Sequence, residues 1–142
     1  MMFLGEFRQA VSEEGWFALP QAFSLQNNDE LILTRGFDHN LLLYSGEEWR
    51  RLAGRLLQKP ISSSAVRALR RRLFSNAVVV KPDGLGRISI PASLRDFAGI
   101  GSALVVAGLY DHLELWSEEE WQAVLEDVTS RKDDGRWDVT GI

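Results

Sequence analysis

The sequence predicts an α+β fold in which two copies of one unit share a core. Residues 31–49, LILTRGFDHNLLLYSGEEW, align with residues 103–121, ALVVAGLYDHLELWSEEEW, at a shift of 72 positions. Residues 15–23 align with residues 86–94 at a shift of 71. The matched pairs are Gly36 with Gly108, Leu41 with Leu113, Ser45 with Ser117, Trp49 with Trp121, and Pro20 with Pro91. A duplicated unit within one chain predicts a pseudo-two-fold structure, in which each half does the same thing at a symmetric place.

Length and composition indicate a globular protein. The chain has 142 residues, of which 45% are hydrophobic and 25% charged, which suits one ordinary domain or two small ones packed together. The absence of cysteine rules out disulfides, thiolate catalysis and thiolate zinc sites. The sequence has no apolar run long enough to cross a bilayer, and its first residues, MMFLGEF, lack the order of a signal peptide. We therefore expect a cytoplasmic protein with no membrane contact.

The first copy is expected to begin with two strands and a short helix. The apolar segments 3–9 and 16–19 are short enough for strands, and turn residues separate them. Pro20 suits the first turn of a helix, because its missing N–H would be unpaired there in any case. A short helix is therefore predicted over 20–25, followed by a turn at 27–29.

A hairpin and a helix complete the first copy. Segments 30–35 and 41–44 are rich in Leu, Ile and Tyr and flank a stretch of Gly, Asp, His and Asn, which predicts a β-hairpin. Ser45 and Glu48 have the spacing of a capping box, in which the serine oxygen accepts an N–H of the first helical turn. A helix is therefore predicted over 46–58.

A second helix lies between the copies, and the second copy then repeats the order of the first. The helix is predicted over 63–74, where Val66, Leu69 and Leu73 keep helical spacing while the arginines face outward. The elements predicted for the second copy are a strand over 76–82, a turn over 83–86, a strand over 87–90, a helix over 91–98, strands over 103–108 and 112–116, and a helix over 118–129. Gly99 can end its first helix in a left-handed conformation, and Ser117 repeats the capping box.

These elements divide the chain into a first repeat over 1–59, a connecting helix within 60–75, a second repeat over 76–129 and a tail over 130–142. The tail has no hydrophobic period, so we expect it to be mobile. Four short strands cannot bury both faces of a sheet alone, so the two copies are expected to interleave into one small barrel with helices packed outside. The aromatic pairs Trp49 with Trp121 and Tyr44 with Trp116 are interpreted as core anchors.

Charge is unevenly distributed along the chain. The formal net charge is −4, which argues against a general positive coat for nucleic acid. Eight of the sixteen basic residues nevertheless lie between Arg50 and Arg72, and acidic residues gather after Glu114. Two interpretations are open: the helices that carry these charges attract each other within or between subunits, or the basic helices face DNA phosphates.

The chain resembles the MraZ family of bacterial transcription regulators, which sit at the start of the division and cell-wall gene cluster. The resemblance covers nearly all of residues 2–129 and is carried by the opening FLGEF, the paired strand-turn-strand-Pro units, the segment DGLGRISIP and the ending LELWSEEEW. It implies two tandem AbrB/MazE-like swapped-hairpin units (SpoVT-AbrB-like repeats) that form one pseudo-two-fold barrel domain. It also implies a homo-oligomeric ring, associated with the nucleoid, that binds G-rich direct repeats in double-stranded promoter DNA. No cofactor, metal, small-molecule substrate or enzyme activity is expected.

The family is marked by an Asp-x-x-x-Arg motif in each repeat, and the second copy keeps it as Asp83 and Arg87. An arginine held by an aspartate can donate two hydrogen bonds to guanine O6 and N7. We expect Arg87 to read guanine, Asp83 to hold the loop, and Gly84 and Gly86 to permit backbone angles that other residues resist. Lys81, just upstream, and Arg8, in the first strand, are expected to contact phosphate.

The first copy departs from this motif, with Ser12 in place of the aspartate and Trp16 in place of the arginine. Tryptophan cannot make the bidentate contact, although its ring could pack on a thymine methyl or a sugar. Glu13 and Glu14 also place acid where phosphates would approach. The first unit is therefore expected to be mainly structural. Linked copies in a ring can still bind specifically through effective concentration, but the same departures fit a family member that has drifted from its operator.

Two rival functions remain open from the sequence. The first is a protein-interaction module, similar to the antitoxin halves of toxin pairs, with helix 63–74 as the partner surface. The second is an enzyme, because the two histidines follow aspartates, at 38–39 and 111–112, and a carboxylate can orient an imidazole base. Both pairs fall in hairpin turns without a nucleophile at a recognisable spacing, which argues against catalysis and against a metal site.

Overall fold

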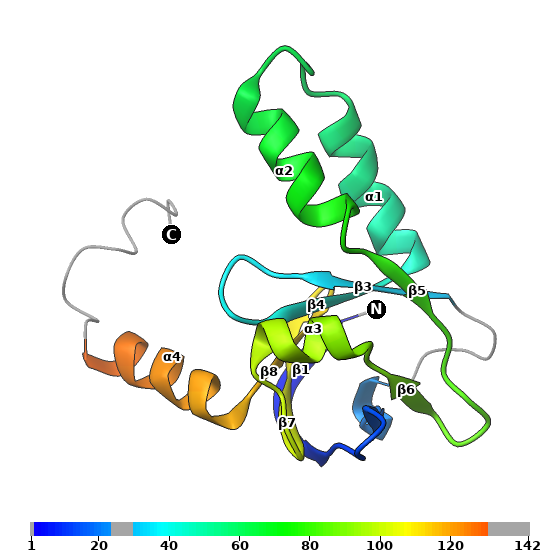
Figure 1. The fold of residues 1–142 in the computed structure, drawn as a ribbon, viewed down its shortest axis with the longest axis vertical. Coiled ribbons are helices and arrows are strands. Elements are labelled where there is room, and N and C mark those ends of the chain that lie inside the picture. Colours follow the sequence, from blue (N-terminus) through cyan, green and yellow to red (C-terminus); the bar gives the residue numbers. More distant parts are fainter. Residues whose placement is uncertain (1, 24–29, 131–142) are drawn as a thin grey trace.

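The computed structural model describes residues 2–23 and 30–130 and has the expected α+β fold (Figure 1). The elements, in chain order, are β1 (Phe3–Ala10), β2 (Trp16–Ala18), the 3₁₀ turn η1 (Gln21–Phe23), β3 (Leu31–Arg35), β4 (Leu41–Ser45), α1 (Gly46–Leu57), α2 (Ser64–Phe74), β5 (Val78–Val80), β6 (Arg87–Ser89), α3 (Ala92–Ala98), β7 (Ala103–Tyr110), β8 (Leu113–Trp116) and α4 (Glu118–Ser130). None of the helices within these ranges is both long enough and apolar enough to span a membrane.

The described strands interleave the two halves of the chain. The six-stranded antiparallel sheet has the order β1-β7-β8-β4-β3-β5, and β2 pairs with β6 in a separate two-stranded ribbon. If each strand is exchanged for its counterpart in the other half, the order is reversed but otherwise unchanged. Apart from the hairpins β3–β4 and β7–β8, every pairing joins one half to the other. The strand pairing therefore has the two-fold pattern that the repeat predicts.

The repeat alignment is wrong by one residue in the first strand of each hairpin. Leu33 pairs with Leu43 in the first hairpin, and Val106 pairs with Leu115 in the second. Leu43 and Leu115 are equivalent at the shift of 72 read from the sequence, so Leu33 corresponds to Val106, one position further along than that shift allows. A one-residue change in register would move every side chain to the other face of the sheet.

The extra residue lies at the hairpin tip. In the first hairpin, five residues beginning with Gly36 separate the last paired residues, Arg35 and Leu41. In the second hairpin, only four residues separate the last paired residues, Gly108 and Leu113. Gly108 is therefore the counterpart of Arg35, and its apparent match with Gly36 is a coincidence of the ungapped alignment. Burial decides the register, because core-facing leucines must stay on the core side while the tip can change length.

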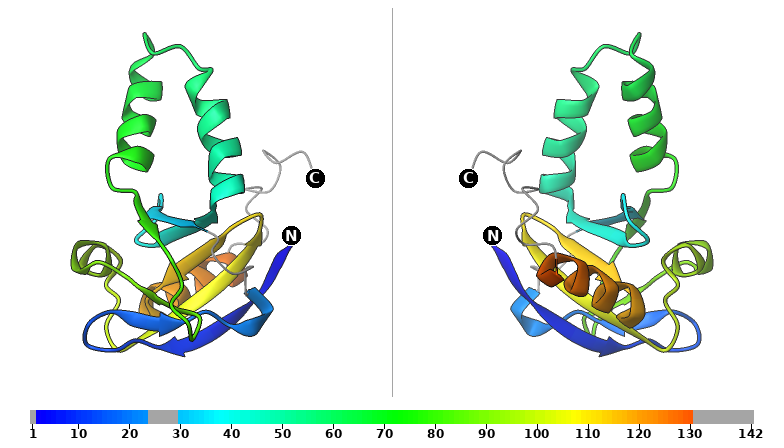
Figure 2. Two further views of the ribbon diagram at one scale, coloured as in Figure 1. Left: turned by 90° about the vertical axis from the view of Figure 1, so that its right-hand side faces the viewer. Right: turned by 90° about the vertical axis from the view of Figure 1, so that its left-hand side faces the viewer.

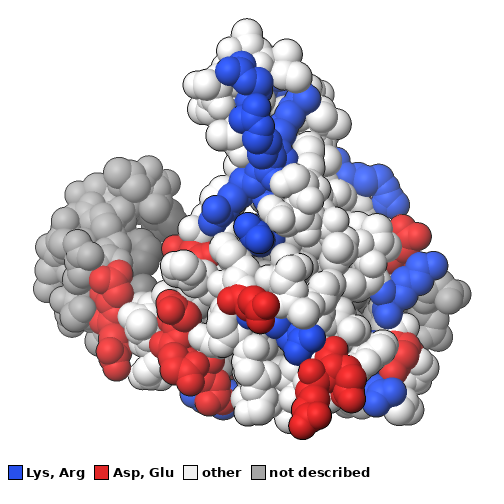
Figure 3. All heavy atoms as spheres, viewed as in Figure 1, with Lys and Arg blue, Asp and Glu red and all other residues white. Residues whose placement is uncertain are grey.

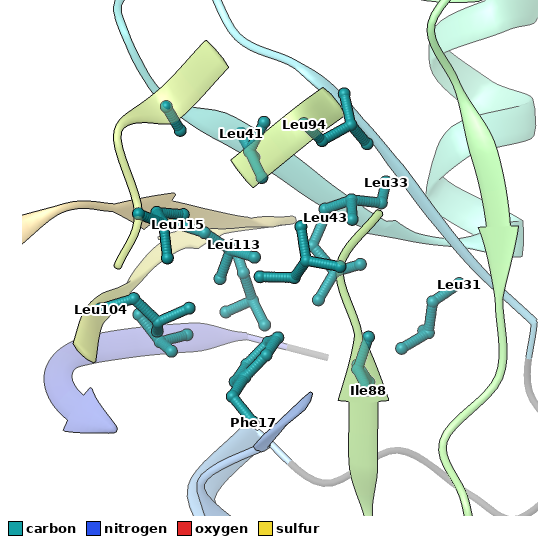
Figure 4. Close-up of a cluster of buried hydrophobic side chains, with 14 of the residues drawn as sticks. Phe17, Leu31, Leu33, Leu41, Leu43, Ile88, Leu94, Leu104, Leu113 and Leu115 are labelled. Atoms are coloured by element: carbon teal, nitrogen blue, oxygen red, sulfur yellow. The ribbon is translucent and has the colours of Figure 1, made fainter. Parts of the chain in front are cut away.

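A single main core draws on both halves of the chain (Figure 4). Phe17 of β2 and Ile88 of β6 are direct partners in the ribbon and are almost completely buried. They point toward leucines of the six-stranded sheet, including Leu43, Leu104 and Leu115. The ribbon thus packs its inner face on the sheet and leaves its outer face to solvent.

The hairpin of α1 and α2 stands on the opposite face of the sheet and projects away from it (Figure 2). Residues of β4 alternate between the two faces, so Leu42 and Tyr44 leave the main core and join a second cluster with Leu56 and Leu73. The buried Thr34 hydroxyl donates to the Leu73 carbonyl over 2.8 Å, which ties the end of α2 to β3.

Helix starts agree with the sequence. The hydroxyl of Ser45 accepts from the backbone N–H of Glu48 at 3.2 Å, and that of Ser117 accepts from the N–H of Glu120 at 3.1 Å. Gly99 ends α3 with φ 66°, in the left-handed region. Both capping serines and this C-terminal glycine are therefore confirmed.

Some predicted bounds differ from those observed. The strand expected over 76–82 is limited to Val78–Val80, because Pro82 has no N–H to continue the ladder. The helix expected over 20–25 is a 3₁₀ turn over Gln21–Phe23, and its last residues and the turn at 27–29 lie outside the described residues. The tail beyond Ser130, expected to be mobile, also lies outside them. The limits of the two repeats and of the connecting helix stay predictions.

Candidate nucleic-acid interface

The loop that carries Asp83 and Arg87 is a tight turn between β5 and β6. The N–H of Asp83 donates to the Arg87 carbonyl at 2.9 Å, and the N–H of Gly86 donates to the Asp83 carbonyl at 3.0 Å. One carboxylate oxygen of Asp83, Oδ1, accepts from the N–H groups of Leu85 at 2.9 Å and Arg87 at 2.8 Å. The aspartate therefore ties the two ends of the loop together through the backbone.

The other carboxylate oxygen holds the arginine side chain. Asp83 Oδ2 accepts a hydrogen bond from Arg87 Nε at 2.7 Å and forms an ion pair with Nη2, also at 2.7 Å. The side chain of Arg87 is 48% exposed, so the guanidinium is fixed at its base and open to solvent at its tip. The backbone N–H of Arg87, and then its guanidinium, lower the pKa of Asp83 from its ordinary value. The carboxylate is therefore ionised at neutral pH and can keep the arginine in place.

Only one of the two loop glycines is required by backbone conformation. Gly86 has φ 74°, in the region that side chains disfavour, whereas Gly84 has no positive φ. A Cβ added to Gly84 would meet none of the described atoms within 4 Å. The expectation that the turn needs glycine at position 84 is therefore wrong, and the requirement lies at Gly86.

The first copy builds the same turn without the motif. The N–H of Ser12 donates to the Trp16 carbonyl at 2.9 Å, and the N–H of Gly15 donates to the Ser12 carbonyl at 2.9 Å. The hydroxyl of Ser12 accepts from the N–H of Trp16 at 3.0 Å, in the position of the Asp83 carboxylate. Gly15 has φ 93° and matches Gly86. The first copy has thus kept the backbone of the loop and lost the guanidinium.

The two loops meet on the outer face of the β2–β6 ribbon. In this ladder Trp16 pairs with Ser89 and Ala18 pairs with Arg87, and these four residues lie on the face opposite Phe17 and Ile88. The guanidinium carbon of Arg87 lies 5.6 Å from the centre of the Trp16 ring, within the range of a cation–π contact. The residues at the fifth position of the two loops are therefore neighbours on one exposed surface.

The two predicted phosphate contacts lie in different places. Lys81 is exposed and lies two residues before Asp83, on the approach to the loop. Arg8 forms an ion pair with Glu118 of α4 at 3.2 Å. Its ladder partner Val105 alternates with the core residues of β7, so Arg8 lies on the α4 side of the sheet and not on the side of the ribbon. The structure brings Lys81, but not Arg8, near the loop.

The charged surface divides by element (Figure 3). Arginine and lysine side chains gather over the α1–α2 hairpin, and acidic side chains gather over α4. Several arginines of the hairpin donate to backbone carbonyls of the same chain: Arg67 to those of Ile61 and Ser62, Arg70 to that of Leu57, and Arg72 to that of Gly36. These hydrogen bonds leave part of the basic charge engaged within the fold.

One contributor to the interface was missed from the sequence. Arg95 of α3 donates to the carbonyls of Ile90 at 3.0 Å and Glu13 at 3.2 Å, so it fixes the first loop against α3. A Cβ at Gly15 would lie 2.7 Å from Arg95 Nε, which shows how closely they pack. The contact spans 82 positions in sequence, and no local spacing could have indicated it.

The two Asp–His pairs that suggested an enzyme differ in the structure, since the Asp111–His112 pair forms a side-chain contact. His112 is bonded to Asp111 at 2.7 Å and stacks on Tyr44 with ring centres 4.6 Å apart. His39 instead lies 6.0 Å from the ring of Phe97. Within residues 2–23 and 30–130 there is no group of three or more histidine, aspartate or glutamate side chains that could hold a metal ion. Each histidine lies against an aromatic ring of another element, His112 against Tyr44 of β4 and His39 against Phe97 of α3.

Comparison with known proteins gives a consistent result. The family described as "MraZ protein, putative antitoxin-like" matches residues 2–72 and again residues 73–136. A protein of Herpetosiphon aurantiacus named transcriptional regulator MraZ is 45% identical over 125 residues, which cover 88% of this chain and 87% of the relative. Relatives with the same name from Roseiflexus sp. and Thermomicrobium roseum are 40% and 39% identical, over 87% and 88% of this chain and equal shares of their own.

Proposed function

The chain belongs to the MraZ family, and we propose that it is a sequence-specific DNA-binding transcriptional regulator that reads guanine with Arg87. The name shared by its relatives supports the regulatory role. The observation that carries the proposal is the loop of β6, in which Asp83 fixes the base of an exposed arginine side chain. Such a side chain is already ordered before DNA arrives, so little conformational entropy is lost on binding.

The hydrogen-bond count of the guanidinium supports this role. Arginine has five N–H donors, and Asp83 binds the side of the guanidinium, through a hydrogen bond from Nε and an ion pair with Nη2. The two N–H groups on Nη1 and the second on Nη2 form a fork at the tip of the side chain. A fork of this kind matches the O6 and N7 acceptors of guanine in the major groove.

The β2–β6 ribbon, which carries Arg87, also has a shape that fits the major groove of DNA. The β2–β6 ribbon is two-stranded with an exposed outer face, and the major groove of B-DNA admits a two-stranded ribbon. Lys81 would contact phosphate beside the loop, and Gly84 would allow close approach of the backbone. Arg8 lies on the other face of the sheet, so a phosphate contact by Arg8 would have to form apart from the ribbon and would require Glu118 to release the arginine.

Assembly completes the proposed mechanism. One reading arginine per chain is a weak unit, and the acidic Glu13 and Glu14 lie in the other loop. A closed ring of subunits, each a pair of swapped-hairpin repeats in one barrel, would present the unit several times to G-rich direct repeats in nucleoid DNA. Such multivalency raises affinity without new contacts. The operator would lie upstream of the division and cell-wall gene cluster.

Fluorescence anisotropy tests the proposal, with labelled DNA from upstream of the protein's own gene cluster and a scrambled duplex of equal length. We expect tight binding to the upstream DNA only, and loss of this preference in Arg87→Ala. Arg71→Ala removes the same charge from the exposed surface of α2 and serves as the matched control. For Arg87→Ala, the slope of log affinity against log salt should change by no more than the contribution of one phosphate contact, because Arg87 is expected to contact a base.

Two other outcomes would point elsewhere. Equal losses in Arg87→Ala and Arg71→Ala would indicate that the basic helices bind phosphate and that Arg87 does not read sequence. Equal affinity of the assembled wild type for both duplexes would favour the second candidate, a drifted, antitoxin-like interaction protein. The projecting α1–α2 hairpin would then be the surface to test against a protein partner.

A further inference from the structure

We infer that Trp16 is a specificity-determining residue that contacts the methyl group of a thymine next to the guanine read by Arg87. The inference rests on the proposed function, since it assigns a second base contact to the same surface. It gives the altered first loop a role in readout, where the sequence alone favoured a structural role. It also implies that each subunit reads an asymmetric step, with a guanine on one side and a thymine on the other.

The first argument is the position of Trp16. It follows the first loop as Arg87 follows the second, and both loops close with the same backbone hydrogen bonds. The side chain lies on the outer face of β2, on the face opposite the buried Phe17, and it is partly exposed. A surface that presents Arg87 to a base edge therefore presents the Trp16 ring beside it.

The second argument is the separation of the two side chains. The ring centre of Trp16 lies 5.6 Å from the guanidinium carbon of Arg87. Base pairs in B-DNA are spaced by about 3.4 Å, so the ring lies within one or two base steps of the guanine. The two side chains can therefore contact adjacent positions of one site without any change of the ribbon.

The third argument is chemical. An indole ring has a large apolar surface and cannot make the bidentate contact that identifies guanine. In the major groove the 5-methyl group is the apolar feature that distinguishes thymine from the other bases. Trp16 thus suits a thymine beside an arginine-bound guanine.

The test uses two versions of the upstream DNA, one synthesised with thymidine and one with deoxyuridine, which lacks only the methyl group. For wild-type protein we expect affinity to fall by about fourfold per contacted methyl, which is the fold-change equivalent of roughly 0.8 kcal/mol per buried carbon. Trp16→Ala should bind both versions with equal affinity. Trp16→Phe keeps an apolar ring and should retain part of the difference. Arg87→Ala, where its residual binding is measurable, should keep the difference between the two DNAs.

The outcomes separate this inference from the proposed function. If wild type and Trp16→Ala show the same ratio between the two DNAs, Trp16 only supports the Arg87 side chain, and the inference is overturned while guanine readout stands. If wild type binds both versions equally but still requires Arg87, the inference is also overturned alone. If wild type shows no preference for the upstream DNA, both fail together. Circular dichroism of each variant shows that the folded protein is being compared.

Discussion

Thr34→Val is the sharpest test of how the helical hairpin is attached to the sheet. The Thr34 side chain is completely buried, and its hydroxyl donates to the carbonyl of Leu73 at 2.8 Å. Leu73 lies in the last turn of α2, which ends at Phe74, so its carbonyl has no N–H partner within the helix. Valine has nearly the same shape as threonine, so the substitution removes the hydrogen bond without opening a cavity.

The expected cost follows from the carbonyl that is left behind. A buried acceptor without a partner costs about 1–3 kcal/mol. For a domain of this size the midpoint of thermal unfolding should fall by roughly 4 °C per kcal/mol, which gives a decrease of about 4–12 °C. Urea unfolding followed by circular dichroism should show a lower midpoint with an unchanged slope. The protein concentration must be held constant, because any subunit association would shift the midpoint.

Thr34→Ser is the matched control, since it keeps the hydroxyl and removes one buried methyl group. It should cost about 1 kcal/mol. Two results would contradict this role of Thr34: a Thr34→Val variant as stable as wild type within about 0.5 kcal/mol, or a serine variant less stable than the valine variant. Either result would mean that the Leu73 carbonyl finds water or another donor, and that apolar packing alone holds the hairpin.

Three further predictions follow from the same structure. Restoring the motif with Ser12→Asp and Trp16→Arg together should raise affinity for DNA with a second guanine at the thymine position and remove the dependence on the thymine methyl, as measured by anisotropy. Burial, and then a nearby acid, raises the pKa of Tyr44 from 10.0 to about 12. The neutral phenol of Tyr44 therefore contributes stability that is complete below pH 10 and is lost as pH rises toward 12. Absorbance at 295 nm should resolve this late titration. Gly86→Ala should destabilise the loop by about 1 kcal/mol in urea unfolding because of its positive φ, whereas Gly84→Ala should change stability by less than about 0.5 kcal/mol.

Most of the fold could be predicted because each element has a local signal. The capping serines Ser45 and Ser117, the glycine at position 99 and the alternating apolar segments specify where helices and strands begin and end. The repeat predicted that the halves pair with each other. It could not reveal the one-residue difference at the hairpin tips, because an ungapped match of similar strands gives no information on which face of the sheet is buried.

The site was predictable only in part, for a similar reason. The Asp83–Arg87 pair lies within five residues and has a local signature, so the sequence located it. The contact of Arg87 with Trp16 and the hydrogen bond of Arg95 to the first loop depend on the pairing of β2 with β6, which joins residues about 70 positions apart. The orientation of Arg8 toward α4 depends in turn on the register of β1 with β7. The pairing register of strands that are far apart in the sequence cannot be recognised from the residues of either strand alone.

The interleaved pairing explains how the first loop can differ from the second at its fifth position while the fold stays intact. Each loop is bonded to the strand of the other half: the N–H of Leu19 donates to the Gly86 carbonyl, and the N–H of Ile90 donates to the Gly15 carbonyl. These bonds use backbone atoms, so they do not depend on the side chain at the fifth loop position. Ser12 preserves the turn with its hydroxyl. The structure therefore constrains Gly15 and the backbone of the first loop, whereas the residue at position 16 can vary without loss of the turn, as the proposed readout by Trp16 requires.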